Sequence, residues 1–84
     1  MSNYSITRTT ISGGKFYYNE NRQCHREDGP AFEHTNGHKK WYINGKLHRE
    51  DGPAIEYASG VKEYWINGKQ YNSLDEGLMD QAIR

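Results

Sequence analysis

Short runs in which aromatic or aliphatic side chains alternate with polar ones recur along the chain. Four of them are Ala31–Thr35, His38–Ile43, Ala54–Ala58 and Val61–Ile66. An alternation with a period of two residues places successive side chains on opposite sides of a strand. Because the runs are also rich in aromatic and β-branched residues, they predict short, half-buried strands.

The alternation places rings on both sides of the predicted sheet. Trp41 and Ile43 share one side, opposite Tyr42, and the run at 64–66 repeats this order with Trp65 in the place of Tyr42. The side that also carries the isoleucines is the better filled with apolar groups. We therefore expect Tyr42 and Trp65 to face away from the core, as candidate binding residues.

Turn-forming residues separate the runs. Asn-Gly at 44–45 and at 67–68 tolerates the positive φ of a type I′ hairpin turn. Asp-Gly-Pro at 28–30 and at 51–53 predicts a second kind of break, since proline cannot donate to a strand ladder. There we expect the aspartate side chain to bond to backbone amides of the turn. The predicted structural turn residues are Asp28, Asp51, Gly29 and Gly52.

These elements belong to a tandem repeat. Residues 18–40 and 41–63 align without a gap, with 11 of 23 positions identical, including the unbroken string HREDGPA. A third copy begins near residue 64 and soon breaks off. A repeat of this length is typical of stacked supersecondary units. We expect units that begin near residues 18, 41 and 64, within a repeat region at 15–71.

The gapless alignment also predicts two columns of equivalent positions across the sheet. The first column is Tyr18, Trp41 and Tyr64, and the second is Asn19, Tyr42 and Trp65. A ladder of rings can stack nucleic-acid bases or grip a peptide. A ladder can equally be core packing, and both interpretations remain open at this point.

The two ends differ from the repeats, as the caps of a repeat array do. Residues 1–14 predict a capping strand, with Tyr4 and Ile6 in alternation, closed by glycines at 13–14. Ser73 and Glu76 have the spacing of a capping box, and residues 72–84 predict a short helix. Its expected packing stripe is Leu74, Leu78, Met79, Ala82 and Ile83. Residues 1–84 thus predict one mainly all-β domain, an antiparallel sheet of hairpin repeats with a C-terminal capping helix.

Composition narrows the function. Eleven acidic and eleven basic residues cancel, so the basic excess of a typical nucleic-acid-binding protein is absent. The chain has one cysteine and therefore no internal disulfide. No apolar run is long enough to cross a membrane. We expect a cytoplasmic protein that uses no cofactor and no membrane.

The doubled string His-Arg-Glu-Asp is the strongest candidate for chemistry. Catalytic sites are usually single, whereas structural motifs are copied with their repeat, so we expect no enzyme. We expect the arginines to pair with Glu33 and Glu56 and the histidines to donate to nearby carbonyls. Repeated ligand contact is the alternative, and its candidate residues are Arg26, Arg49, His25, His48 and Lys46. Cys24, His25, His34 and His38 lack a complete set of zinc ligands, so we expect no metal.

The string NGKLH at 44–48, followed by a glycine and an aromatic residue, resembles the MORN repeat. A MORN unit usually continues with G-x-G after the histidine, whereas this chain continues with REDGPA at 49–54. The variant NGKxHREDGPAxE resembles a divergent MORN-like subtype found in phage and large-DNA-virus proteins. The resemblance covers residues 15–71. It implies a single-layer sheet with a binding or scaffolding role, and it carries no catalytic residues.

Together these features predict a non-catalytic binding module that binds and modulates a host macromolecule. The resemblance alone implies that a phage encodes it and that it acts in the host cytosol. The expected partner is a host protein, and a homo-oligomer is compatible with the mild charge difference between the two halves of the chain. One alternative is an oligomeric anti-defence protein that sequesters a small nucleotide signal. A second alternative is binding of single-stranded nucleic acid by stacking, which the neutral charge disfavours.

Overall fold

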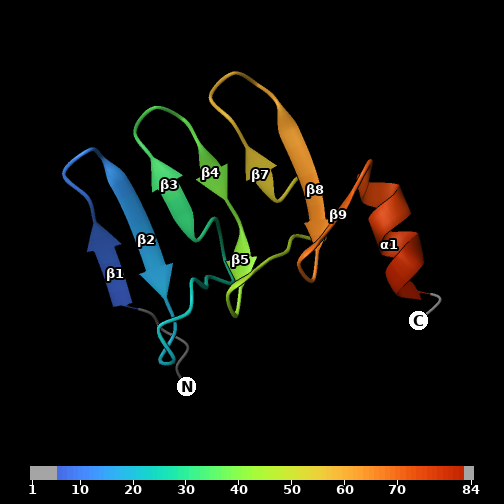
Figure 1. The fold of residues 1–84 in the computed structure, drawn as a ribbon, viewed down its shortest axis with the longest axis horizontal. Coiled ribbons are helices and arrows are strands. Elements are labelled where there is room, and N and C mark those ends of the chain that lie inside the picture. The colour runs from blue at the N-terminus through green and yellow to red at the C-terminus, as the bar shows by residue number, and fades with distance from the viewer. Residues whose placement is uncertain (1–5, 83–84) are drawn as a thin grey trace.

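The computed structural model describes residues 6–82 and shows a mainly β fold, as the sequence predicts (Figure 1). Seven strands form one antiparallel sheet, in the order β1-β2-β3-β4-β7-β8-β9, and β5 and β6 form a separate two-stranded hairpin. The strands are β1 (Ile6–Thr9), β2 (Gly14–Tyr18), β3 (Phe32–His34), β4 (Lys39–Lys40), β5 (Tyr42–Ile43), β6 (Lys46–Leu47), β7 (Ile55–Glu56), β8 (Lys62–Ile66) and β9 (Lys69–Tyr71). One helix follows, α1 (Leu74–Ala82).

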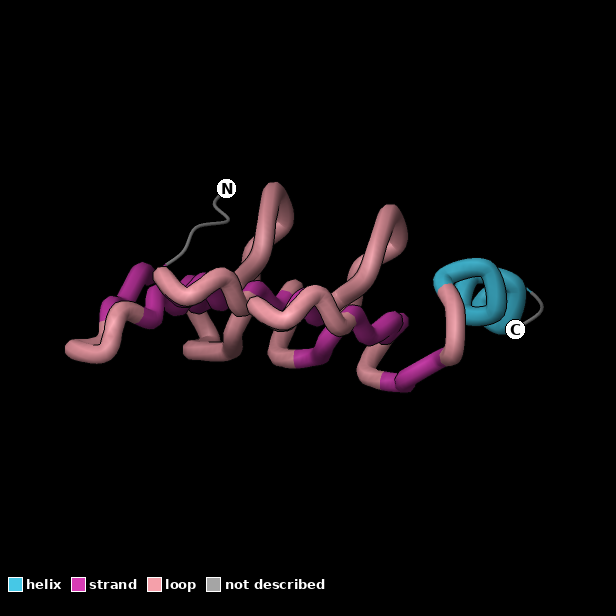
Figure 2. Tube along the Cα trace, turned by 90° about the horizontal axis from the view of Figure 1, so that it is seen from above, coloured by secondary structure: helices cyan, strands magenta, loops and turns pink. Residues whose placement is uncertain are grey.

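The sheet is a single layer. The molecule measures 40 × 35 × 16 Å, so it is a thin slab. Figure 2 shows the slab edge-on, with two tall loops rising from one side and shorter loops protruding on the other. The tall loops carry the two copies of HREDGP, at 25–30 and 48–53, and we call them arm 1 and arm 2.

The Asn-Gly hairpins fold as predicted and connect neighbouring repeat units. Asn44 and Gly45 have φ angles of 49° and 83°, and the pair at 67–68 is almost the same at 51° and 82°. Positive φ at both central residues defines the type I′ turn. The Gly45 amide donates to the Cys24 carbonyl at 2.8 Å, and in the next unit Gly68 donates to Leu47 at 2.9 Å. Each hairpin therefore docks on the unit before it.

The structure corrects the predicted alignment of the first unit. The amide of Tyr17, not of Tyr18, makes the hydrogen bond that is equivalent to that of Trp41: Tyr17 donates to Ala31 at 2.8 Å, and Trp41 donates to Ala54 at 2.7 Å. The reason is that three residues, 20–22, stand where the next unit has the two-residue Asn-Gly turn, so the first loop is one residue longer. The true columns are Tyr17, Trp41 and Tyr64 on one side, and Tyr18, Tyr42 and Trp65 on the other.

The N-terminal cap is a strand, as expected. β1 pairs antiparallel with β2 along its whole length, from Ile6 opposite Tyr18 to Thr9 opposite Lys15. The turn between them has Gly13 with a φ of 102°. Tyr4, which the sequence places in the same strand, lies outside the described residues.

The helix begins where the capping box predicts, but it packs differently. The Glu76 amide donates to Ser73 Oγ at 3.2 Å, while the Glu76 carboxylate accepts from the Asn72 amide at 2.9 Å. The expected packing stripe is wrong for Leu78 and Met79, whose exposed fractions are 37% and 68%. Ala82 is also exposed, and Ile83 lies outside the described residues.

Gly77 is the buried residue of the helix. A Cβ at Gly77 would come within 2.9 Å of Ile66 Cγ1 and 3.0 Å of Tyr71 Cδ2. The missing side chain thus allows α1 to approach β8 and β9 closely. Because Tyr71 occupies the repeat position of His48, α1 follows at the point where a third arm would begin (Figure 1).

The buried core is small. Among the described residues the buried hydrophobic side chains are Ala31, Ala54, Ile55 and Ile66, and His25 is the buried polar residue. A sheet that has only one layer can bury little apolar surface on its own. Within residues 6–82 no helix is long and apolar enough to cross a membrane.

Candidate functional site

Arm 2 is held to the sheet by Arg49. Its guanidinium carbon lies 3.9 Å from the centre of the Trp41 ring. Nε donates to Asp51 Oδ1 at 2.9 Å, and one terminal nitrogen donates to the Pro53 carbonyl at 3.0 Å and to Glu56 Oε2 at 3.3 Å. The arginine therefore joins both ends of the arm to a ring and a carboxylate of the sheet.

Arm 1 repeats these contacts. Arg26 lies 4.1 Å above the Tyr17 ring and bonds to Asp28, to the Pro30 carbonyl and to Glu33 at 3.0, 3.2 and 3.3 Å. Burial works to lower the pKa of Arg26, but the hydrogen bond to Asp28 and the nearby acidic groups outweigh it, so the pKa is raised. The predicted pairing of the two arginines with Glu33 and Glu56 is confirmed.

The histidines connect each arm to the next hairpin. His25 Nδ1 accepts the Asn44 amide at 2.9 Å, and His48 Nδ1 accepts the Asn67 amide at 3.0 Å. In the neutral ring the proton is then on Nε2, which faces Glu27 in arm 1 at 3.5 Å. The expected donation from histidine to a carbonyl is therefore wrong, because each ring accepts from the backbone instead.

The turn residues also act differently from the prediction. The carboxylate of Asp28 or Asp51 accepts from the arginine two residues earlier, and no hydrogen bond from a turn amide to it is seen in the described chain. Gly29 and Gly52 make room for that arginine. A Cβ at Gly52 would lie 2.8 Å from Arg49 Cζ, and one at Gly29 would lie 3.1 Å from Arg26 Cζ.

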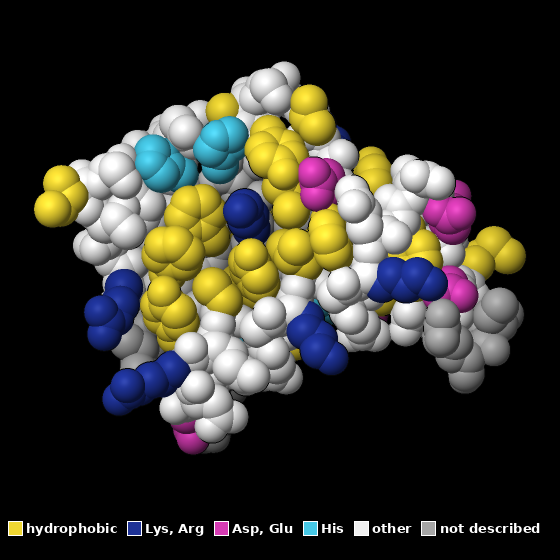
Figure 3. Space-filling model, viewed as in Figure 1, with side chains coloured by type: hydrophobic (Ala, Val, Ile, Leu, Met, Phe, Trp, Pro, Cys, Tyr) yellow, Lys and Arg dark blue, Asp and Glu magenta, His cyan; other side chains and the backbone are white. Residues whose placement is uncertain are grey.

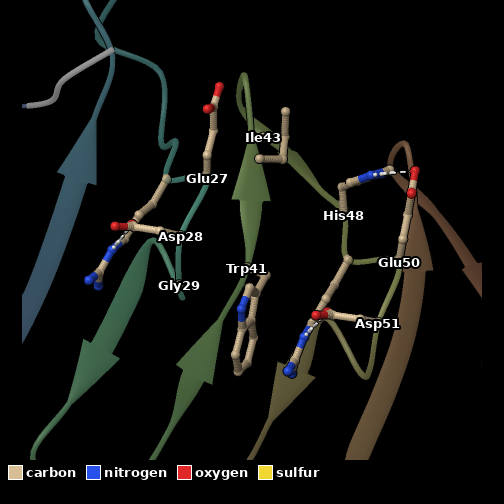
Figure 4. A pocket seen from close by; sticks show the side chains of 10 residues that line it. Glu27, Asp28, Gly29, Trp41, Ile43, His48, Glu50 and Asp51 are labelled. Atoms are coloured by element: carbon tan, nitrogen blue, oxygen red, sulfur yellow. Dashed lines mark hydrogen bonds and ion pairs between the residues drawn. The ribbon is translucent and has the colours of Figure 1, made fainter. Parts of the chain in front are cut away.

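A groove of about 600 Å³ lies between the two arms. Figure 4 shows the indole of Trp41 between them, with Asp28 and Gly29 on one side and Asp51 on the other. The groove is lined by Arg26, Glu27, Asp28, Gly29, Trp41, Ile43, His48, Arg49, Glu50 and Asp51. Both arginines are already paired with carboxylates, so the groove offers no unpaired cation to a phosphate. The paired arginines of the groove therefore disfavour the alternative function, sequestration of a small nucleotide.

The opposite side of the sheet carries an aromatic surface. One cross-strand row runs through Phe16, Phe32, Lys40, Ile55 and Glu63, in register over β2, β3, β4, β7 and β8. Residues directly opposite each other in neighbouring strands point to the same side. We call this side the aromatic face. Figure 3 shows its hydrophobic side chains gathered into one patch over β2 to β7.

Rings in this patch contact one another. The centres of Phe16 and Phe32 are 4.6 Å apart, and those of Phe16 and Tyr18 are 6.0 Å apart. All three rings are half-buried. In the described chain α1 packs against β8 and β9 at the end of the sheet, so no element of the described chain covers these rings.

Tyr42 and Trp65 belong to the aromatic face. Trp65 Nε1 donates to Glu63 Oε1 at 2.9 Å, and Tyr57 donates to the other oxygen of Glu63 at 2.9 Å. Burial raises the pKa of Tyr42, and the neighbouring Cys24 adds to the effect. The hydrogen bond to Glu63 raises the pKa of Tyr57. Both candidate rings are half-buried, and neither lies fully covered.

The predicted site residues therefore separate into two groups. Tyr42 and Trp65 lie on the aromatic face, whereas Arg26, Arg49, His25 and His48 hold the arms on the other side. Lys46 is exposed on the β5–β6 hairpin and belongs to neither group. The sequence analysis missed Phe16, Phe32, Lys40 and Glu63, because strand pairing and the longer first loop decide their common row.

The histidines near Cys24 in sequence make separate hydrogen bonds to backbone amides and do not form a common metal site. His38 Nδ1 accepts the Ala58 amide at 3.0 Å, and His34 Nδ1 accepts the Asn36 amide at 3.1 Å. Burial raises the pKa of the Cys24 thiol. Among residues 6–82 no three His, Cys, Asp or Glu side chains gather in a geometry that could hold a metal ion.

Comparison of the chain with models of known protein families, with curated proteins and with solved structures finds no match in any of the three.

Proposed function

We propose that the chain is a non-catalytic binding module that recognises a protein through its aromatic face. The observation that carries this proposal is the uncovered patch around Phe16, Phe32, Tyr42 and Trp65. Contiguous apolar surface on a small domain commonly marks an interaction site, and aromatic residues dominate the binding energy of interfaces.

The arms support the same choice by elimination. Arg26, Arg49, His25 and His48 all have partners within the chain, and each partner holds an arm in place. A ligand at these groups would compete with bonds that the fold already uses. On the aromatic face the rings of Phe16, Phe32 and Tyr42 make no side-chain hydrogen bond within the described chain, and Trp65 makes one, to Glu63.

For the biological setting, we propose a small phage-encoded accessory protein that binds and modulates a host protein, as an inhibitor in an anti-defence role. This part rests on the resemblance of the NGKLHREDGPA string to MORN-like repeats of phage and large-DNA-virus proteins. The repeated, internally satisfied HRED string suits a scaffold that presents a surface, which is the role the resemblance implies.

The proposal is tested by affinity capture from a bacterial host lysate, followed by mass spectrometry and a binding assay with the captured protein. Tyr42→Ala and Trp65→Ala should each weaken binding by about thirtyfold, because a truncated interface ring commonly costs 2 kcal/mol or more. The matched control is Tyr64→Ala, which changes the neighbouring ring of β8 that points to the other side.

Circular dichroism of all three variants must show a folded protein. If Tyr64→Ala abolishes capture while Tyr42→Ala and Trp65→Ala leave it unchanged, the aromatic face is not the interface and the arm side must carry the binding.

A further inference from the structure

Two opposite charges lie symmetrically about Ile55 on the aromatic face. Lys40 on β4 and Glu63 on β8 are both in register with Ile55 on β7, one strand away on either side. Neighbouring strands are about 4.8 Å apart, so the two charges are separated by two strand spacings.

Neither charge has a counter-ion within the described chain. The Lys40 ammonium lies 5.9 Å from the centre of the Phe32 ring and forms no ion pair there. Glu63 accepts from the indole of Trp65 and the phenol of Tyr57, which are neutral donors. Among the described residues the row thus carries Lys40 and Glu63 without an ion pair, and a second cation, Arg8, lies in the same row at the far end of the sheet on β1.

The repeat places the rings with the same symmetry. Lys40 and Glu63 are equivalent positions of successive units, and so are Tyr42 and Trp65, two residues further along. A two-fold axis that runs along the strands over Ile55 therefore brings Lys40 of one molecule opposite Glu63 of another. The same axis brings Tyr42 opposite Trp65. A face with this property is complementary to itself, as a two-fold interface requires.

The size and layering of the sheet also fit a second copy. The molecule measures 40 × 35 Å across the sheet, and an axis over β7 overlaps its strands from β3 to β9, which is enough area to bury the roughly 800 Å² per partner of a stable interface. A sheet with one apolar face normally buries it against a second layer, and two sheets with nearly aligned strands make a sandwich.

We propose that the aromatic face from β3 to β9 is covered by a second copy of this chain, in a two-fold dimer with Lys40 paired to Glu63 across the axis. The proposal rests on the proposed function in its choice of face. The occupant that it names for that face is a second copy of the chain. An axis along the strands keeps the same end of both sheets together, so the β5–β6 and β8–β9 hairpins of the two copies lie at one rim (Figure 1). A target protein that uses the same face must displace the second copy.

A charge swap tests the pairing. Sedimentation equilibrium should show a dimer for the unchanged protein. Lys40→Glu and Glu63→Lys should each raise the dimer dissociation constant by at least about tenfold, because each creates two like-charge contacts. The double variant should restore the dimer. An equimolar mixture of the two single variants should form a heterodimer as tight as the unchanged dimer, which also shows that both variants are folded.

The matched control is Lys39→Glu, the same charge reversal on the opposite side of β4, and it should leave the dimer unchanged. A monomer at every concentration, or a mixture no tighter than the single variants, overturns the proposed dimer. A monomer that still loses its target through Tyr42→Ala leaves the binding function standing. A dimer whose charge variants dissociate, while ring variants do not affect target capture, leaves the dimer and overturns the binding function.

Discussion

The two sides of the same sheet carry different kinds of side chain: the arm side is mainly charged and the aromatic face is mainly apolar. On the arm side one row runs through Lys15, Glu33, Lys39, Glu56 and Lys62, with alternating charge across five strands. Both carboxylates of this row, Glu33 and Glu56, also bind the arm arginines. On the aromatic face the adjacent row carries rings, an isoleucine and the charged residues Arg8, Lys40 and Glu63, which form no ion pair within the described chain.

This difference suggests separate roles, with the arm side stabilising the fold and the aromatic face available for recognition. On the arm side the two arginines, the two histidines and the carboxylates Glu33 and Glu56 find their partners within one chain, so these groups contribute to folding. On the aromatic face the rings keep exposed edges, so the favourable burial of that surface is still available to a partner. Substitutions on the two sides should therefore change different measured quantities.

The largest effect on stability is expected from Arg49→Ala. The change removes the stacking on Trp41 and the bonds to Asp51, the Pro53 carbonyl and Glu56. It leaves partly buried acceptors without a donor, so we expect a loss of about 2–4 kcal/mol in the free energy of unfolding. Urea denaturation followed by circular dichroism measures it.

Two further variants sharpen this expectation. Asp51→Ala should cost only about 0.5–1 kcal/mol, because its side chain is 87% exposed and Arg49 keeps its other partners. Lys40→Ala on the aromatic face should change stability by less than about 0.5 kcal/mol. Equal losses for Arg49→Ala and Lys40→Ala would remove the contrast between the two sides.

A smaller effect is expected from Gly52→Ala, compared with Gly29→Ala. The new Cβ would lie 2.8 Å from Arg49 Cζ in arm 2 but 3.1 Å from Arg26 Cζ in arm 1. An unconstrained arginine would move aside, but this one is fixed by three bonds and a ring. We expect about 1–2 kcal/mol for Gly52→Ala and less for Gly29→Ala, measured as the shift in denaturation midpoint. The reverse order would show that the arginine is not fixed.

The smallest effect concerns alkaline pH on the aromatic face. The hydrogen bond to Glu63 raises the pKa of Tyr57 above the ordinary value of 10.0. A raised pKa means that the phenol's contribution to stability is complete below pH 10 and is lost as pH rises through the raised value. Ultraviolet titration should show one late-ionising tyrosine fewer in Tyr57→Phe. If the tyrosine that disappears ionises with the ordinary ones, and the late-ionising step is unchanged, the bond is absent in solution.

The repeat made much of the fold predictable. The hairpin turns, the strand runs and the start of the helix follow from local signals, since Asn-Gly, the period of two and the capping box act within a few residues. The packing of the helix was not predictable in this way. Glycine is a weak helix former, so the sequence gives no reason for Gly77 within the helix. The close approach of Ile66 and Tyr71, which leaves no room for a Cβ, explains it.

The sequence by itself determined a sheet of hairpin units and the pairing of the arm arginines with Glu33 and Glu56, because these features are repeated and local. Tertiary structure alone decided that Tyr17, not Tyr18, is the equivalent of Trp41. It also decided that the aspartates bind arginine and that the histidines accept from the next hairpin. The aromatic row has the same origin. It depends on which strands pair and in which register, and register is set by contacts between residues far apart in the chain.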